Sequence, residues 1–453
     1  MEELTACKNA NLGVCLLNDS FPPVIDGVAN TICNYASIIQ SETEGRAMVA
    51  TPYYPHAVDN YEFPVFRYRS VSVGSKFEGY RVGYPFSASV VDEIKKQKPQ
   101  IIHTHCPFAS NILARALREA LDIPIVFTYH TKYDVDIAKT IDFGLIQNAA
   151  IKLMIANIES CDEVWVVSEG AGENLRSLGF KGEYHIMENG VDFPRGRVPD
   201  ERVDEVRALH GLSTAIPTFL FVGRMKWYKG IKIILDGLRK AKERGCKFKM
   251  MFVGDGEDMG EIKGYTDGIG LADECIFTGA IYDREKLRAY FCAADLFLFP
   301  STYDTNGIVV REAAACSLAS VLVRGSCAAE GVIDNQNAFL IDENAESLAE
   351  AVINACQNPE KLPEVGEAAA KELFISWHEA VQKAYARYQV VVDNYKKGST
   401  NRRERFSDEF ITMMADSMDA VQKVRKMREK LKRNQSRWKG NNRIEVRKHY
   451  KDK

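Results

Sequence analysis

Residues 300–315 read PSTYDTNGIVVREAAA, and this stretch decides the fold that we predict for the chain. An apolar run at 296–299 precedes it, and a polar turn containing Gly307 leads into helical apolar spacing. A buried strand that ends in a turn and a helix N-terminus is where α/β sheets bind anionic ligands. Two carboxylates, Asp304 and Glu312, bracket the turn. An ordinary strand–turn–helix connection is the alternative interpretation of the same residues.

The length and composition favour a globular protein with more than one domain. The chain has 453 residues, of which 46% are hydrophobic and 27% charged, which predicts two domains and an appendage. Its eleven cysteines include no CxxC pair, which is typical of reduced thiols in a cytosolic protein. The first residues are polar, and no apolar run reaches the roughly 18 residues that a membrane span needs. We therefore expect a cytoplasmic protein.

The net charge of −3 is unevenly distributed along the chain. Residues 396–453 contain 19 Lys and Arg against 8 Asp and Glu, whereas the remainder contains 40 against 54. From Ser407 the tail shows an apolar stripe at helical spacing with cations on the other side. Such a helix can lie on an anionic membrane surface, pack on the body or on a second copy, or stay solvated. No nucleic-acid-binding module is recognisable, so we expect no nucleic-acid partner.

Short apolar runs alternate with helical patterns along the chain. We predict strands at 12–17, 47–51, 101–105, 125–128, 161–168, 218–222, 250–253, 275–278 and 296–299, and helices at 111–121, 283–294 and 366–395. This alternation predicts an α/β fold with parallel, doubly wound sheets, whose strand C-terminal ends carry the functional loops.

Residues 223–230, GRMKWYKG, follow the strand predicted at 218–222. Two glycines enclose two separated cations, Arg224 and Lys229, in front of a predicted helix. A guanidinium can donate two parallel hydrogen bonds and an ammonium supplies a point charge, so the stretch suits a diphosphate. A solvated surface turn is the alternative.

Two further loops could approach a ligand. Gly27 follows a proline-rich loop and precedes a predicted helix, so its backbone could come close to a phosphate, although a plain turn would look the same. His103, His105 and His130 fall at strand ends, where histidines are more often structural. A metal site is disfavoured because no carboxylate or cysteine lies at ligand spacing.

Taken together, these stretches resemble the retaining, nucleotide-sugar-dependent glycosyltransferases of family 4, over most of the chain before the tail. Asp304 and Glu312, with seven residues between them, resemble the family's donor-site signature. SFPPVIDGVANTI at 20–32 resembles the opening of the lipid-glycosylating members, and TYHTKYD at 128–134 resembles a loop whose histidine contacts the donor sugar.

The resemblance implies the GT-B arrangement, in which two Rossmann-like domains face each other across a cleft. It implies an acceptor-binding domain at 1–200 and a nucleotide-sugar-binding domain at 201–375. A helix at 376–395 would pack back on the first domain, and the basic helical tail would occupy 396–453.

The resemblance also implies roles for particular residues. The expected catalytic residues are His130, Arg224, Lys229 and Asp304. The expected donor-binding residues are Gly27, Gly223, Ile281, Asn306, Gly307, Ile308 and Glu312. Glu312 would hold the ribose hydroxyls, Asp304 would face the sugar, and the two cations would neutralise the diphosphate. No acidic pair of the metal-binding type follows a suitable strand, so we expect no metal ion and no cofactor besides the donor.

The implied activity is transfer of a hexose, glucose, from UDP-glucose to a lipid such as diacylglycerol, with the enzyme peripheral on the inner face of the cell membrane. A soluble sugar or sugar-phosphate acceptor, a non-catalytic nucleotide-sugar sensor and a UDP-sugar epimerase are the alternatives. Three departures from the family pattern bear on the donor sugar: Asn306 replaces an aromatic residue, 316–319 read CSLA in place of Cys-Gly-x-Pro, and 337–338 read Asn-Ala in place of Asn-Gly.

Overall fold

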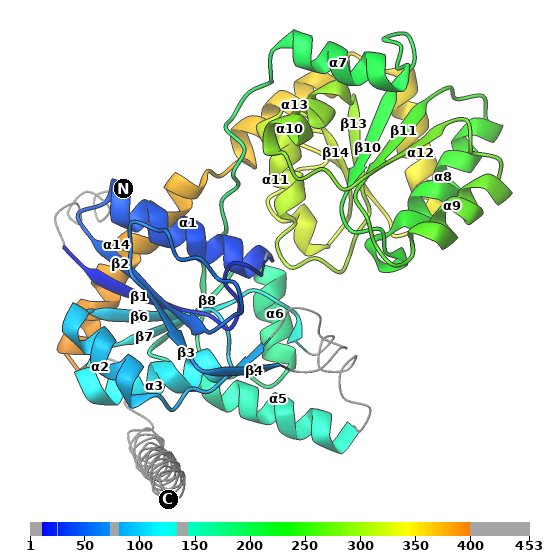
Figure 1. Ribbon diagram of the computed structural model, residues 1–453. Helices are drawn as coiled ribbons and strands as arrows, with labels where there is room; N and C mark the ends of the chain where they lie inside the picture. The colour runs from blue at the N-terminus through cyan, green and yellow to red at the C-terminus, as the bar shows by residue number, and fades with distance from the viewer. Residues whose placement is uncertain (1–10, 25, 73–80, 134–143, 399–453) are drawn as a thin grey trace, which may run out of the picture. The chain divides into compact units, whose positions relative to one another are not determined.

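The computed structural model describes residues 11–24, 26–72, 81–133 and 144–398 (Figure 1). The chain divides into two compact units. The first comprises Met1–Phe127, Leu153–Glu163 and Tyr388–Lys453, and the second comprises Thr128–Lys152 and Val164–Arg387. The tail predicted from 399 onward lies outside the described residues.

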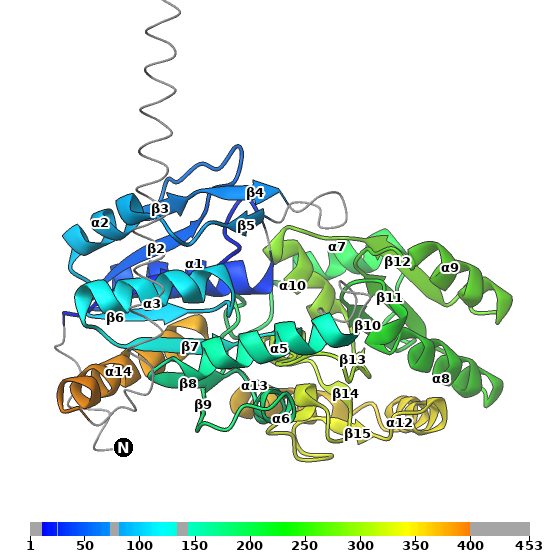
Figure 2. The same ribbon diagram turned by 90° about the horizontal axis from the view of Figure 1, so that it is seen from below.

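A seven-stranded sheet has the order β3-β2-β1-β6-β7-β8-β9. Its strands are β1 (Gly13–Leu17), β2 (Arg46–Pro52), β3 (Val65–Tyr68), β6 (Ile101–Thr104), β7 (Ile125–Tyr129), β8 (Glu163–Val166) and β9 (His185–Ile186). Helix α1 (Gly27–Glu42) covers one face, and α2 (Ala88–Gln97) and α3 (Ala109–Leu121) cover the other (Figures 1 and 2). The chain also forms α5 (Gly144–Glu159), α6 (Glu169–Ser177) and an antiparallel pair, β4 (Ser70–Ser72) and β5 (Arg81–Gly83).

A six-stranded parallel sheet has the order β12-β11-β10-β13-β14-β15. Its strands are β10 (Thr218–Val222), β11 (Lys249–Val253), β12 (Cys275–Gly279), β13 (Leu296–Phe299), β14 (Ser320–Val323) and β15 (Phe339–Ile341). One face carries α8 (Ile231–Glu243), α9 (Met259–Gly268) and α12 (Ala345–Gln357); the other carries α7 (Asp200–His210), α10 (Arg284–Ala293), α11 (Ile308–Ala315) and α13 (Lys361–Glu372) (Figure 1).

The central strands of this second sheet are apolar along their whole length because helices cover both of their faces. Strands β10 and β13 contribute TFLFV and LFLF, whose aromatic and aliphatic side chains are almost fully buried. Successive strands run outward from β10 in one direction and from β13 in the other. The carboxyl ends of β10 and β13 therefore lie side by side at the point where the strand order reverses, which is where doubly wound sheets bind ligands.

Every strand predicted from the sequence is present, within one residue at each end, except at 161–168, which shortens by two residues at each end to β8. The two Rossmann-like α/β sheets are confirmed, whereas six strands were not predicted: β3, β4, β5, β9, β14 and β15.

The helix predicted to run unbroken over 366–395 is interrupted, because the chain forms α13 and then α14 (Trp377–Lys396); the bounds of α14 agree with the helix expected at 376–395. The break has a local cause: Ser376 Oγ accepts from the Glu379 N–H at 3.1 Å, and the Glu379 carboxylate accepts from the Ser376 N–H at 2.9 Å. This reciprocal pair is a capping box, which starts a new helix.

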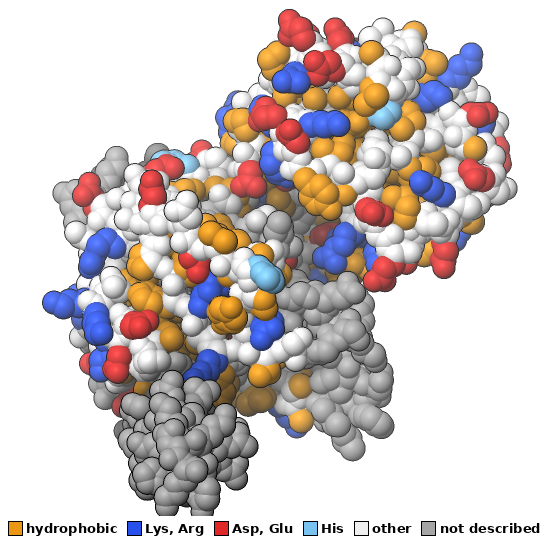
Figure 3. Space-filling view, viewed as in Figure 1, with side chains coloured by type: hydrophobic (Ala, Val, Ile, Leu, Met, Phe, Trp, Pro, Cys, Tyr) orange, Lys and Arg blue, Asp and Glu red, His pale blue; other side chains and the backbone are white. Residues whose placement is uncertain are grey.

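Each helix within the described ranges is too short or too polar to cross a bilayer. The ten cysteines of the described part of the chain are free thiols. Acidic and basic side chains are interspersed with hydrophobic ones on the face seen in Figure 3.

Candidate functional site

The loop after β10 owes its shape to glycines in the loop after β11. A Cβ on Gly254, whose φ is +141°, would lie 1.9 Å from the carbonyl oxygen of Gly223. A Cβ on Gly256 would lie 2.4 Å from the carbonyl oxygen of Met225. The two backbones can pack this closely only because these side chains are absent. Arg224 is thereby held on an exposed bend.

Arg224 and its neighbour Lys226 differ in their partners. Lys226 is paired with two carboxylates, Glu257 and Asp258. The Arg224 guanidinium makes no hydrogen bond or ion pair with any residue that the structure describes. An exposed guanidinium that no carboxylate neutralises can donate its planar fork to an anionic ligand. Of the two cations, Arg224 is therefore the one suited to phosphate.

Lys229 and Asp304 come from the loops that follow β10 and β13. The Lys229 Nζ donates to Asp304 Oδ1 at 2.6 Å, and Ser301 Oγ donates to Asp304 Oδ2 at 2.6 Å. The pair forms because the two loops touch: a Cβ on Gly230 would lie 2.2 Å from the Pro300 carbonyl oxygen. The family resemblance assigns Lys229 to the donor phosphates and Asp304 to the donor sugar. In the structure the two side chains are in direct contact.

Lys229 is also enclosed by aromatic rings. Its Nζ lies 5.8 Å from the centroid of the Tyr228 ring and 5.4 Å from that of Tyr303, and the two rings contact each other. Ring faces attract a cation without neutralising its charge. The ammonium therefore has a fixed position while it keeps N–H groups for another acceptor.

Gly307 begins α11 in a conformation that requires glycine. Its φ is +59°, and a Cβ would lie 2.9 Å from Ala328. No side chain caps α11, so its first N–H groups, from Ile308 onward, are oriented towards the loop. Asn306 is buried, and its Nδ2 donates to the Val167 carbonyl at 2.6 Å.

Glu312 lies one turn into α11 and is 8% exposed. Burial raises the pKa of its carboxyl group, and the charge and hydrogen bond of Arg284 lower it. Arg284 Nη2 lies 2.5 Å from Glu312 Oε1.

Ile281, predicted to face the nucleobase, follows β12 and is half-buried, whereas the neighbouring Tyr282 is 88% exposed.

His130 follows β7 and is 7% exposed. Burial lowers the pKa of its imidazole to about 3, so the ring is neutral at physiological pH. Its carbonyl oxygen accepts a hydrogen bond from Thr305 Oγ1 at 2.7 Å, within the second unit. A neutral imidazole can exchange hydrogen bonds with a sugar hydroxyl but adds no positive charge.

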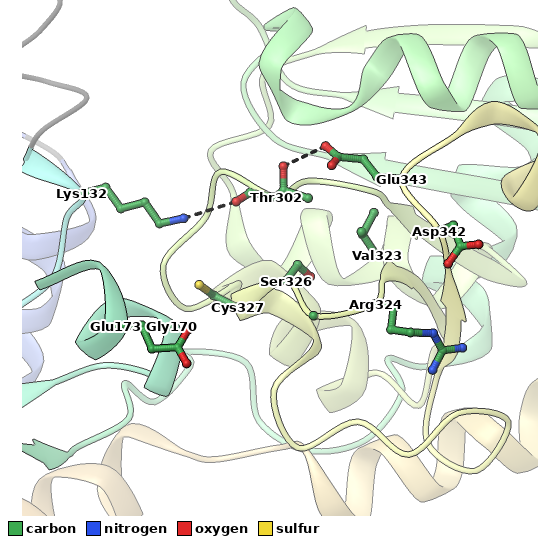
Figure 4. A pocket seen from close by; sticks show the side chains of 11 residues that line it. Lys132, Gly170, Glu173, Thr302, Val323, Arg324, Ser326, Cys327, Asp342 and Glu343 are labelled. Carbon is green, nitrogen blue, oxygen red and sulfur yellow. Dashed lines mark hydrogen bonds between the residues drawn. The ribbon is translucent and has the colours of Figure 1, made fainter. Parts of the chain in front are cut away.

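A cavity of about 490 Å³ opens beside the loop at 300–307 (Figure 4). Lys132 Nζ donates to the Thr302 carbonyl at 3.3 Å, and Thr302 Oγ1 donates to Glu343 at 3.0 Å. Arg324, Asp342 and Cys327 also line it. None of the residues predicted to contact the donor lines this cavity, so it neighbours the candidate site without belonging to it.

Gly27 begins α1, and a Cβ there would meet nothing within 4 Å, so its backbone is open to a ligand. The Asp26 carboxylate, however, accepts from the N–H groups of Val28 at 2.9 Å and Ala29 at 2.7 Å. The N-terminus of α1 therefore has its own anionic cap, which was not predicted from the sequence although Asp is a common N-cap residue.

The departures at 316–319 and 337–338 lie away from the candidate site. They precede β14 and β15, whereas the site loops follow the strands, and parallel strands place these at opposite edges of the sheet. Ser317 adopts the left-handed conformation with φ +54°, and the buried Asn337 donates to Glu372 at 2.8 Å. Of the three departures, Asn306 alone falls in a site loop.

Three residues that shape the candidate site were not predicted from the sequence: Gly254, Gly256 and Arg284. Gly254 and Gly256 shape the loop that carries Arg224, and their Gly-x-Gly spacing after a predicted strand could have indicated this. Arg284 binds Glu312 from 28 positions away, and no local pattern reveals a pair between two helices. Among the described residues, no three His, Cys, Asp or Glu side chains cluster as a metal site would require.

Two family models match the chain. The family described as Glycosyltransferase Family 4 matches residues 26–195, and Glycosyl transferases group 1 matches residues 203–372. An alpha-monoglucosyldiacylglycerol synthase from Streptococcus pneumoniae is 26% identical over 75% of this chain and 77% of its own length. A protein of the same name from Acholeplasma laidlawii is 24% identical over 79% of this chain and 94% of its own length.

The solved structure of Anabaena Alr3699/HepE in complex with UDP and glucose shares the fold. It superposes with a TM-score of 0.64 at 17% identity, covering 84% of this chain and all of that one. The two family matches together span far more than half of the chain: the first contains every strand of the seven-stranded sheet except β1, and the second contains the whole six-stranded sheet. The chain therefore belongs to the group 1, family 4 glycosyltransferases, which have the GT-B fold.

Proposed function

We propose that this glycosyltransferase moves glucose from UDP-glucose to a lipid acceptor such as diacylglycerol, with retention of configuration and without a metal ion. The observation that carries the proposal is the grouping of Arg224, Lys229 and the uncapped N-terminus of α11 at one edge of the second sheet. Two cations and a helix N-terminus together offer several N–H donors to a diphosphate, and Asp304 offsets part of the charge of Lys229.

The chemistry of the leaving group explains why fixed cations would accelerate transfer. As the bond between the sugar and the diphosphate breaks, negative charge grows on the departing phosphate. Arg224 and Lys229 would stabilise that charge without reorganising, because their loops are held by close backbone packing. Lys229 has three N–H donors, so it can keep its bond to Asp304 while it binds a phosphate oxygen.

The remaining site residues would hold the other parts of the donor. Glu312 would accept hydrogen bonds from the ribose hydroxyls, and the backbone at Ile281 would face the base. Asp304 and the loop around Gly307 would face the sugar, with the neutral His130 binding a sugar hydroxyl. These assignments rest on the family pattern and agree with the burial and position of each residue in the second unit.

Retention would arise by attack of the acceptor on the face from which the diphosphate departs, with the departing phosphate accepting the acceptor's proton. A covalent intermediate would need a carboxylate nucleophile beside the sugar. Asp304 is poorly suited to that role because both of its oxygens already accept hydrogen bonds, from Lys229 and Ser301. We therefore assign Asp304 to positioning rather than to nucleophilic attack.

The lipid acceptor is supported by two independent features. The two relatives described above are named as synthases of a glucosyldiacylglycerol. Residues 396–453 carry 19 cations against 8 anions, a balance that favours an anionic membrane surface. Binding of the full chain to anionic vesicles, weakened by high salt and absent with neutral vesicles, would support the second feature.

The decisive experiment measures release of nucleoside diphosphate from UDP-glucose, UDP-galactose and GDP-mannose, with and without diacylglycerol vesicles. We expect release from UDP-glucose that depends on the vesicles, persists in EDTA and yields an α-linked glycolipid by NMR. Release driven by a soluble sugar phosphate instead would reject the lipid acceptor. Loss of activity in EDTA would reject metal independence, and absence of release with every donor would support a sensor.

A further inference from the structure

Arg284 occupies a position that helix electrostatics disfavours. It is the first residue of α10, directly after the N-cap Asp283. The N-terminal end of a helix carries partial positive charge, which repels a cation. The contacts that Arg284 makes with other residues therefore have to offset this repulsion at the N-terminus of α10.

Three neighbours surround the Arg284 guanidinium. Its Nη2 lies 2.5 Å from Glu312 Oε1 and 3.8 Å from Asp192 Oδ2. Its Cζ lies 4.4 Å above the ring of Phe193, which is 1% exposed and packs edge-on against Phe291 of α10. The side chain is thus fixed by charge on two sides and by a buried aromatic ring on the third.

These contacts join two parts of the chain that are distant in sequence. Asp192 and Phe193 lie at the end of the first family match, directly before the segment that leads into the second. Glu312 lies on α11 within the candidate site. Arg284 therefore bridges the connection between the two family matches, near Asp192 and Phe193, and the carboxylate assigned to the ribose.

Arg284 stabilises the ionised form of the buried Glu312. Its side chain is only 10% exposed, and burial favours the protonated form. The charged groups acting on it are Arg284 of α10, which favours the carboxylate, and Asp192 of the connection, which opposes it. A protonated Glu312 would lose much of its strength as an acceptor for hydroxyl donors.

We propose that Arg284 is a positioning residue for the nucleoside half of the donor: it keeps Glu312 charged and oriented and ties it to the connection at Asp192 and Phe193. This inference rests on the proposed function, because it takes Glu312 as the ribose ligand. Arg284 binds Oε1 of Glu312, and Oε2 would receive the ribose hydroxyl. A purely structural surface ion pair is the competing explanation.

The test compares UDP binding by calorimetry in the parent, Arg284→Met and Arg284→Lys over a series of pH values from mildly acidic to mildly alkaline, because burial raises the pKa of the Glu312 carboxyl group. Arg284→Met keeps the apolar stem over Phe193 but removes the charge. We expect it to weaken binding about ten- to hundredfold at the acid end and to recover as the pH rises, since Glu312 then ionises unaided. Arg284→Lys should bind nearly as well as the parent at every pH.

The matched control is Arg244→Met, which removes an exposed Arg–Glu pair at the end of α8 and should leave UDP affinity unchanged. Parent-like binding by Arg284→Met throughout would overturn the proposal, and so would a loss that is the same at every pH. If the parent itself binds no UDP, the proposed function fails, which is a different result from a difference between parent and variant. Thermal unfolding of each variant identifies any that fails to fold. If Arg284→Met fails to fold, the UDP affinity of Arg284→Lys decides. Parent-like affinity of Arg284→Lys at every pH supports the proposal, and a loss of affinity that is equal at every pH overturns it.

Discussion

The Lys229 ammonium and the Asp304 carboxylate, 75 positions apart in the chain, lie 2.6 Å from each other. The lysine follows β10 and the aspartate follows β13, strands that are neighbours only because the strand order reverses between them. Their side chains are 13% and 23% exposed, so the pair is shielded but still reachable. A donor phosphate would meet an ammonium whose position is already set.

Replacing Lys229 with Met should lower kcat/KM for sugar transfer by about a hundredfold, the usual effect of removing one preorganised group that stabilises transition-state charge. The matched control is Lys232→Met, in the first turn of α8 and three residues after Lys229. Lys232 also forms an ion pair, with Asp236 at 2.9 Å, but its side chain is 58% exposed. Steady-state rates of UDP release should show little change for Lys232→Met. Equal losses in both variants would contradict the role given to Lys229.

Replacing Gly254 with Ala should disrupt the loop that presents Arg224. The new Cβ would lie 1.9 Å from the Gly223 carbonyl oxygen, and the φ of +141° disfavours any side chain. We expect the free energy of unfolding to fall by about 2 kcal/mol or more and the KM for the donor to rise.

Gly260→Ala in α9 is the control for Gly254→Ala. A Cβ there meets nothing within 4 Å, so the substitution should stabilise the helix by about 0.5–1 kcal/mol. Urea unfolding and donor titration measure both variants. If Gly254→Ala is as stable as the parent, the loops that follow β10 and β11 can move apart without a loss in the free energy of unfolding.

Site residues could be predicted from the sequence where a single local stretch carries the whole pattern. Lys229 and Glu312 each lie in a strand–loop–helix stretch that could be recognised without knowledge of the rest of the chain. The pairing of Lys229 with Asp304 could not be predicted, because it depends on which strands become neighbours. Arg284 was missed for a similar reason, since its contact with Glu312 joins two helices on one face of the sheet.

Two misses were avoidable from the sequence. The SWHE at 376–379 is a capping-box pattern, so the break between α13 and α14 could have been predicted. Asp26 before Gly27 is a common N-cap and could have been assigned to α1. Strands β3, β4 and β5 are short and only partly buried, and for that reason they lack the apolar runs that mark the central strands.

Ser317→Gly should stabilise the protein. Ser317 has φ +54°, a conformation that costs a residue with a Cβ about 1–2 kcal/mol and costs glycine little. Because a glycine loses more chain entropy on folding, we expect a net gain of about 1 kcal/mol in the free energy of unfolding. Ser87→Gly is the control: its φ of −121° is ordinary and its side chain caps no N–H of α2, so no gain is expected. A loss of stability in Ser317→Gly would mean that the serine side chain makes a compensating contact.

His130 should make stability depend on pH. The folded protein keeps its imidazole neutral down to about pH 3, whereas the ordinary pKa is 6.5. Between these values the unfolded chain binds a proton that the folded protein does not, so the free energy of unfolding falls as the pH falls, by up to about 1.4 kcal/mol per pH unit. Above pH 6.5 both states are neutral, and the effect disappears.

The test is urea unfolding of the parent and of His130→Gln at several pH values below 6.5, because the difference between the two curves removes the carboxylates that also titrate there. We expect the variant to be less stable than the parent near neutral pH and to lose stability less steeply as the pH falls. His378→Gln, at an exposed position on α14, controls for removal of one imidazole. Parallel curves for the parent and His130→Gln would mean that the buried imidazole takes up a proton in the folded protein, and His130 would then be available as a cation at the site.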